Sequence, residues 1–211
     1  MTGRLPAPQA TRFVQDHTRL CPVPGVPEIR LHLATEAISL WEETETAFAQ
    51  VDSPPPFWAF AWPGGQVLAR LLLDRPELVK GRRVLDLGSG SGLVAVAAAK
   101  AGAAHVVASD VEPLSPAAIA LNAAANAVEI ADVVGDILDD PVGRAADHHT
   151  AGLPTTAYDV VLVGDLCYER PLAARVLGYL RRVRSHGADV LVGDPGRAYL
   201  PRAELRALAG Y

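Results

Sequence analysis

The feature that most constrains the fold is a change of pattern at Arg82. From there the chain alternates short runs of β-branched residues with alanine-rich segments of helical length. Runs this apolar, separated by helices, are typical of a parallel sheet covered on both faces. The predicted strands are residues 83–87, 105–109, 131–134, 159–164 and 189–193, and the predicted helices are residues 93–101, 115–127, 172–185 and 202–208. The predicted fold class is α/β, with a doubly wound, mostly parallel sheet.

The residues before Arg82 follow other patterns. Residues 28–42 alternate apolar and polar side chains on either side of a short Thr-Glu break, which is typical of a β-hairpin. The apolar positions are Ile29, Leu31, Leu33, Ile38 and Leu40. Helical spacing of apolar residues predicts a further helix over residues 64–74. We expect a single domain, with residues 1–55 as an N-terminal extension and residues 56–211 as the core.

Composition narrows the class of protein. Half of the 211 residues are hydrophobic and the net charge is −5. These values suit one globular domain and argue against a nucleic-acid surface, which needs a dense basic stripe. We find no signal peptide and no membrane span, and we expect a cytoplasmic monomer. Cys21 and Cys167 form no C-x-x-C pair, and His148-His149 has no acid or thiol at ligand spacing, so we expect no metal site.

The segment VLDLGSGSG, residues 84–92, runs from a strand into a glycine loop that opens a helix. Glycines allow a sharp turn and a close approach to a ligand, and the free N–H groups at a helix start attract an anionic group. The spacing also fits the dinucleotide pattern G-x-G-x-x-A, so NAD stays possible. Asp86 would oppose the pyrophosphate of NAD but complement the ammonium and sulfonium of S-adenosylmethionine. Charge therefore favours S-adenosylmethionine.

Each predicted cofactor contact follows from a position in this pattern. Asp110 ends the second strand, where it can accept hydrogen bonds from the ribose hydroxyls, and Asp136 follows the third strand near the adenine amino group. The predicted cofactor-binding residues are Trp62, Asp86, Gly88, Ser89, Gly90, Gly92, Asp110, Asp136 and Asp165.

The next two strands also end in acids. The segment VVLVGDLCYE contains Asp165, Tyr168 and Glu169, and the segment VLVGDPGR contains Asp194. Ligands of open α/β sheets lie beyond the carboxyl ends of the strands, so these side chains should border the same crevice as the glycine loop. Asp165 and Tyr168 are the residues that we expect to act in the transfer step.

Residues 57–66, FWAFAWPGGQ, concentrate aromatic side chains after a run of prolines. Rings beside a sulfonium and a lysine ammonium would form an apolar wall with favourable cation–π contacts. We expect Trp58 and Trp62 to form that wall, and Phe57 and Phe60 to be a hydrophobic plug under the sheet.

Four segments, PFWAFAWPGGQVLARLL, VLDLGSGSGLVAVAAAKAGA, VVLVGDLCYE and VLVGDPGR, resemble the class I, seven-stranded, Rossmann-like protein-lysine methyltransferases. Within them they resemble the electron transfer flavoprotein β-subunit lysine methyltransferases. The resemblance implies S-adenosylmethionine-dependent methylation of lysines on a folded protein, either that flavoprotein subunit or a ribosomal stalk protein. Asp165 and Tyr168 match the family's acid-x-x-aromatic motif, which implies that they hold the lysine. We expect Trp58, Glu169 and Asp194 to contact the substrate.

Two other functions stay open at this point. One is an NAD-linked oxidoreductase, which Asp86 disfavours, and the other is a non-catalytic S-adenosylmethionine-binding protein. The resemblance also implies a final strand hairpin after VLVGDPGR. Because the chain stops at Tyr211, we expect these C-terminal strands to be missing and the fifth strand to be left as an edge.

Overall fold

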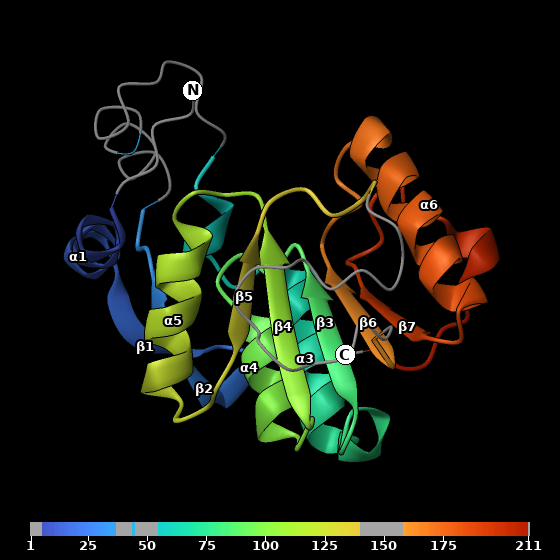
Figure 1. The fold of residues 1–211 in the computed structure, drawn as a ribbon, viewed down its shortest axis with the longest axis horizontal. Coiled ribbons are helices and arrows are strands. Elements are labelled where there is room, and N and C mark those ends of the chain that lie inside the picture. The colour runs from blue at the N-terminus through green and yellow to red at the C-terminus, as the bar shows by residue number, and fades with distance from the viewer. Residues whose placement is uncertain (1–5, 37–43, 45–54, 140–157, 211) are drawn as a thin grey trace.

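The computed structural model describes residues 6–36, 44, 55–139 and 158–210 (Figure 1). Within these ranges a five-stranded parallel sheet forms the centre, in the order β5-β4-β3-β6-β7. Its strands are β3 (Arg83–Leu87), β4 (His105–Asp110), β5 (Ala131–Val134), β6 (Val160–Gly164) and β7 (Asp189–Gly193). The order turns back between β3 and β6, the switch point at which doubly wound sheets bind ligands. The expected α/β fold and its parallel sheet are confirmed.

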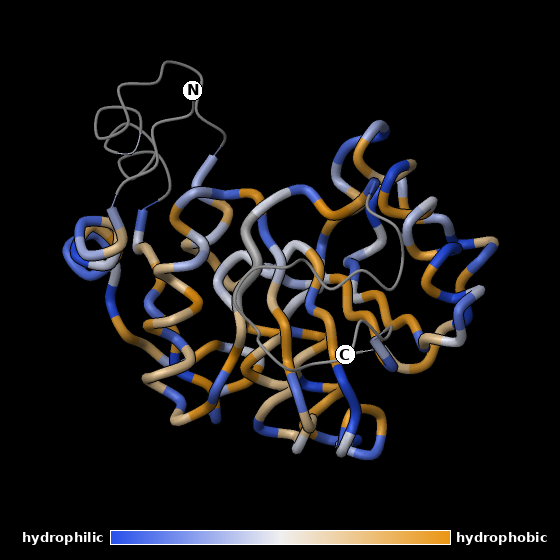
Figure 2. The backbone as a smooth tube through the Cα atoms, viewed as in Figure 1, coloured by the Kyte–Doolittle hydropathy of each residue, from blue (hydrophilic) through white to orange (hydrophobic). Residues whose placement is uncertain are grey.

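Helices cover both faces of the sheet (Figure 1). The helices on one face are α3 (Pro63–Asp74), α4 (Leu93–Lys100) and α5 (Ser115–Ala125), and α6 (Arg170–Ser185) lies on the other. Single turns of 3₁₀-helix occur at η1 (Phe57–Ala59) and η2 (Pro76–Leu78). The strands are mostly hydrophobic along their length (Figure 2), as burial on both faces requires.

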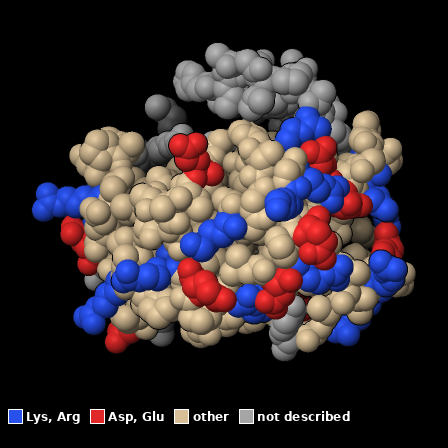
Figure 3. All heavy atoms as spheres, turned by 90° about the horizontal axis from the view of Figure 1, so that it is seen from below, with Lys and Arg blue, Asp and Glu red and all other residues tan. Residues whose placement is uncertain are grey.

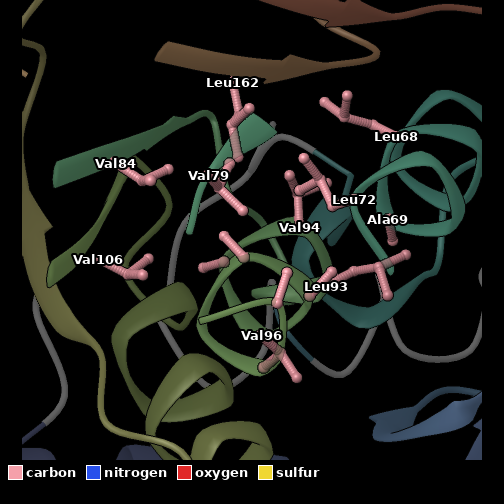
Figure 4. Close-up of a cluster of buried hydrophobic side chains, with 14 of the residues drawn as sticks. Leu68, Ala69, Leu72, Val79, Val84, Leu93, Val94, Val96, Val106 and Leu162 are labelled. Carbon is pink, nitrogen blue, oxygen red and sulfur yellow. The ribbon is translucent and has the colours of Figure 1, made fainter. Parts of the chain in front are cut away.

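Alternate strand residues supply two separate cores, because successive side chains of a strand point to opposite faces. Val84 and Leu162 gather with Leu72 and Val94 of α3 and α4 on one face (Figure 4). Their neighbours on the strands, Leu85, Val161 and Val163, pack with α6 on the other face.

The N-terminal hairpin forms, but with a different partner from the one expected. β1 (Arg19–Val23) pairs with β2 (Val26–Leu33), and Ile29 and Leu31 of β2 are fully buried. The strand predicted from the alternation over Ile29 to Leu33 is confirmed. Its partner strand, however, comes before it in the chain, across a Pro24-Gly25 turn. Proline-glycine is a strong turn signal that could have found this connection. The expected second arm, with Ile38 and Leu40, lies outside the described residues, as do His148 and His149.

Two other elements differ from the sequence predictions. An unpredicted helix, α1 (Ala7–His17), buries Ala10 and Val14 in a cluster shared with α5. The helix predicted over residues 202–208 is wrong, because only Arg202–Glu204 form a single 3₁₀ turn, η3. Short helices need a buried apolar face, and Leu208 is 43% exposed.

Within the described ranges, no helix combines the length and the hydropathy needed to cross a bilayer. The face seen from below carries acidic and basic side chains interspersed (Figure 3). That face therefore offers no continuous basic patch of the kind that binding to phosphates requires.

The amino end of α3 touches the backbone at the end of β7. A Cβ atom added to Gly193 would lie 2.1 Å from the carbonyl oxygen of Gly64, and one added to Gly64 would lie 2.2 Å from that of Gly193. The next pair is nearly as close, since a Cβ on Gly164 of β6 would lie 3.2 Å from the Cα of Gly65. Glycine is thus required for α3 to reach the sheet at this point.

We predict that Gly193→Ala lowers the free energy of unfolding by about 2–3 kcal/mol, because the new methyl group displaces the α3 backbone. The matched control is Gly178→Ala in the middle of α6, where an added Cβ meets only Arg182 Nη1 at 3.8 Å. That change should stabilise the protein by about 0.5–1 kcal/mol, since alanine favours helix. Urea unfolding of both variants checks the pair, and equal effects would contradict the close contact.

Candidate active site

The glycine loop after β3 is fixed to the end of β4. The N–H groups of Gly88 and Ser89 donate to the carbonyl oxygen of Ser109 at 2.8 and 3.0 Å, and the N–H of Gly90 donates to Asp110 Oδ2 at 2.7 Å. Gly90 has a φ of +54°, which favours glycine. Burial raises the pKa of Asp110, although hydrogen bonds from the N–H groups of Glu112 and Gly90 oppose the rise. The structure thus brings the predicted loop and the predicted ribose acid together.

Asp86 lies beneath this loop and is only 1% exposed. Its Oδ2 accepts hydrogen bonds from Ser89 Oγ at 2.6 Å and from the N–H of Ala95 at 3.0 Å. Burial raises the pKa of Asp86 to about 7, despite these two bonds. We expected Asp86 to face the cations of the cofactor, but its observed bonds tie the loop to α4. Asp86 and Ser89 therefore hold the shape of the loop.

Asp165 ends β6 in a strained backbone conformation, with a φ of +60°. Its carboxylate is 8% exposed and lies at the amino end of α3, where Oδ2 accepts the N–H of Gly65 at 2.8 Å. Its Oδ1 pairs with the guanidinium of Arg197. The carboxylate therefore lies between the positive end of the α3 helix dipole and the guanidinium of Arg197.

Asp194 occupies the equivalent place at the end of β7, but it faces its own turn. Its Oδ1 accepts the N–H groups of Gly196 and Arg197, both at 2.7 Å, and its Oδ2 lies 3.5 Å from Arg197 Nη1. The side chain is 2% exposed. The carboxylate is thus engaged by its own turn and by Arg197, and its contact with a substrate stays a prediction. Sequence reasoning missed Arg197, although it closes the GDPGR segment.

The aromatic residues also divide differently from our expectation. Trp58, which we expected in the apolar wall, is instead fully buried in the core beside α1 and α5. Phe57, which we expected in the plug, contacts Tyr168 in a tilted arrangement and Trp62 edge-on, with ring centroids 5.4 and 5.7 Å apart. Trp62 also donates its indole N–H to the carbonyl oxygen of Phe57 at 2.9 Å. Successive residues of a 3₁₀ turn point in different directions, which separates Phe57 from Trp58.

Two further predicted residues, Asp136 and Glu169, lie next to α6. Asp136 pairs with Arg175 of α6 at 2.8 Å and accepts the N–H of Leu138 at 3.1 Å. Burial would raise the pKa of Asp136, but these bonds lower it on balance. An adenine amino group would have to share the carboxylate with Arg175. Glu169 is exposed directly before α6.

Glu112 is an acid that sequence reasoning missed. Its Oε1 is buried and has no hydrogen-bond partner among the described residues. Burial, with the charge of Asp110, raises the pKa of Glu112 to about 8. Its position two residues after Asp110, in the same loop, was the available signal.

These segments meet at one edge of the sheet. A Cβ on Gly88 would lie 2.5 Å from Leu166 Cδ2, and a Cβ on Gly90 would lie 3.6 Å from the carbonyl oxygen of Phe57. Burial raises the pKa of Tyr168, and the charges of Glu169, Asp110 and Glu112 add to the rise. The glycine loop, the aromatic residues and the loop after β6 are therefore neighbours.

Comparison with known proteins identifies the family. The electron transfer flavoprotein beta subunit lysine methyltransferase of Xenopus laevis is 40% identical over 187 residues, covering 88% of this chain and 70% of that protein. The chain belongs to this methyltransferase family. The family's member in Danio rerio is 37% identical, covering 92% of this chain and 70% of its own length.

Likeness to a second group of methyltransferases covers less of the chain. Residues 68–162 match the family model of the ribosomal protein L11 methyltransferase (PrmA). The ribosomal protein L11 methyltransferase of Lactobacillus johnsonii is 39% identical over 106 residues, covering 48% of this chain and 33% of that protein. Membership of the flavoprotein lysine methyltransferase family thus rests on the longer match.

We predict that the free energy of unfolding falls between pH 5 and pH 7. Folded Asp86, with a pKa of about 7, keeps a proton that the unfolded chain releases near its ordinary value of 3.8. The loss is roughly 1.4 kcal/mol per pH unit while only the folded state binds the proton, or about 2 kcal/mol over this window. Glu112 acts in the same direction up to about pH 8.

Urea unfolding across pH 5–8 measures this dependence. Asp86→Asn should make the dependence less steep by removing the share of Asp86, because asparagine does not titrate, and should leave the share of Glu112. Asp159→Asn is the control: hydrogen bonds from Arg83 lower the pKa of Asp159, so its contribution is lost only below about pH 4. An unchanged slope in Asp86→Asn would show that Asp86 is ionised in the folded protein.

Proposed function

We propose that this chain transfers methyl groups from S-adenosylmethionine to lysine side chains of the electron transfer flavoprotein beta subunit. The names of its relatives support this substrate. One observation carries the proposal: the Asp165 carboxylate and the clustered rings of Phe57, Trp62 and Tyr168 adjoin the glycine loop at the same edge of the sheet. A lysine ammonium and a sulfonium are both attracted to such a combination of acid and rings.

The residues around the loop fit S-adenosylmethionine. The Asp110 carboxylate lies directly beside the loop, because one of its oxygens accepts the N–H of Gly90 and the other accepts that of Glu112. Glu112 Oε1 is a buried acceptor in need of a donor, which ribose hydroxyls would provide. The two phosphates of NAD would instead meet the acids at this edge. We infer that Trp62, Asp110 and the loop from Gly88 to Gly92 hold the cofactor.

The chain's own contribution to the reaction is placement and desolvation. S-Adenosylmethionine supplies an electrophilic methyl group, which the neutral lysine nitrogen attacks as the bond to sulfur breaks and the sulfur keeps the electron pair. Asp165 and Tyr168 orient the lysine, and the rings of Phe57 and Trp62 exclude water from it. A drier environment lowers the pKa of the lysine, and alignment supplies much of the rate. The lysine proton leaves to water.

Methylation of ribosomal protein L11 is the second candidate function. The match of residues 68–162 to the PrmA model favours it, because that segment includes α4 and most of the sheet. The match excludes the Phe57–Trp62 segment and Arg197, so it leaves out half of the site described above.

The cytoplasmic location and the monomeric state of the protein stay predictions.

The test is methylation of both purified proteins by this chain, followed by peptide mass spectrometry. We expect methylated lysines on the electron transfer flavoprotein beta subunit and none on ribosomal protein L11. Asp165→Asn should lower kcat/KM by about 100-fold, since misplacing the amine costs that much. Asp189→Asn, at the start of β7, is the matched control with unchanged kcat/KM. Modification of L11 alone would transfer the assignment to the second candidate, and modification of neither would refute both.

Replacements of Tyr168 separate the ring from its hydroxyl. Tyr168→Phe keeps the ring contact with Phe57, so we expect KM for the protein substrate to change less than about threefold. Tyr168→Leu removes the ring and should raise KM by about tenfold, in line with cation–π energies of 0.5 to 2 kcal/mol. Steady-state kinetics check both variants. Equal losses would assign the contribution to the hydroxyl instead.

A further inference from the structure

Arg197 is held between the acids that end β6 and β7. Its Nη1 pairs with Asp165 Oδ1 and lies 3.5 Å from Asp194 Oδ2, and its side chain is 24% exposed. Asp194 Oδ1 also accepts the Arg197 N–H, so it fixes the backbone from which the guanidinium extends. Arg202 Nη2 donates to the carbonyl oxygen of Gly196 at 2.7 Å and steadies the same turn. Backbone and side chain of Arg197 are thus both constrained.

This arrangement fixes the Asp165 carboxylate from two sides. The N–H of Gly65 binds Oδ2 and Arg197 binds Oδ1, so the orientation of the carboxylate group is fixed. The strained φ of Asp165 also needs support from its surroundings. Removal of Arg197 would leave a nearly buried carboxylate with one backbone donor.

The charge of Arg197 matters as much as its position. A lone carboxylate beside a lysine favours the ammonium form, which has no lone pair for attack on a methyl group. The charged groups that act on the two titratable side chains following Asp165 are mostly acidic: Asp165, Asp194 and Arg197 act on the thiol of Cys167, and Glu169, Asp110 and Glu112 act on the hydroxyl of Tyr168. The first turn of α3 contributes N–H groups and no charge. Arg197 is the cation within this set.

We propose that Arg197 is a positioning residue for methyl transfer: it fixes the Asp165 carboxylate and offsets its charge, so that the bound lysine can lose its proton. The inference rests on the proposed function, because it assumes that Asp165 holds the target lysine. Asp194, buried behind Arg197, supports the guanidinium and does not itself touch the lysine.

Two substitutions should move the pH dependence of kcat in opposite directions. The acidic limb of that profile reports the loss of a proton from the lysine in the complex. Arg197→Gln keeps N–H donors but removes the positive charge, so we expect the limb to move up by about one pH unit. Asp194→Asn keeps the Oδ1 acceptor for the turn and removes a negative charge, so the limb should move down. Arg197→Lys keeps the charge and should leave the limb near its wild-type position.

Binding measurements separate this role from damage to the cofactor site. Calorimetric titration with S-adenosylhomocysteine should give the same Kd, within about twofold, for all three variants. Arg184→Gln, which loses an exposed ion pair to Asp189 at 3.0 Å, is the control that should change neither Kd nor the profile. The proposal would be overturned if kcat fell at every pH and the acidic limb did not move in Arg197→Gln or in Asp194→Asn. If Arg197→Gln fails to fold, the opposite movement in Asp194→Asn, with Arg197→Lys unchanged, decides the question.

Hydrogen exchange tests, without any substrate, whether Arg197 helps to hold the Asp165 carboxylate against the Gly65 N–H. Exchange at the Gly65 amide, followed by mass spectrometry of peptides spanning the start of α3, should be faster in Arg197→Gln than in wild type. It should stay near the wild-type rate in Arg197→Lys. Wild type that methylates neither protein would refute the proposed function and leave this readout intact. Unchanged exchange in Arg197→Gln would refute the positioning role.

Discussion

The contact between Gly64 and Gly193 is the constraint on which the site depends. Because no side chain separates the two backbones, the amino end of α3 reaches the ends of β6 and β7. The Gly65 N–H then meets the Asp165 carboxylate, although the two residues are 100 positions apart in sequence. Trp62, which immediately precedes α3, is brought beside Phe57. One backbone contact therefore assembles the acid and the rings, and a side chain at either glycine would separate them.

A second constraint is electrostatic, since several acids converge on the carboxyl edge of the sheet. The fold accommodates them in two ways. Asp165 and Asp194 share Arg197 and receive backbone N–H bonds, whereas burial raises the pKa values of Asp86 and Glu112 to about 7 and 8. Keeping a carboxyl in such an environment costs stability near neutral pH.

The sequence predicts best what local pattern determines. The five strands and the glycine loop follow from hydrophobic runs and from glycine spacing, and both are read within a few residues. Contacts between residues that are distant in sequence are predicted less well. The hairpin partner of β2, the burial of Trp58 and the pairing of Arg197 depend on which surfaces meet, and one sequence does not specify that. The helix expected over residues 202–208 failed for the same reason, since propensity without a buried face does not maintain a helix.

The residues that sequence reasoning missed bear on the chemistry. Arg197 and Glu112 each adjoin a predicted residue in space, Asp165 and Asp110 respectively, and change what that residue can do. Asp165 alone would read as a base for the lysine proton. Asp165 instead has both carboxylate oxygens engaged, one by Arg197 and one by the Gly65 N–H. Under the proposed function such a carboxylate orients the amine, the proton passes to water, and the rate depends on alignment and on a dry approach between the rings.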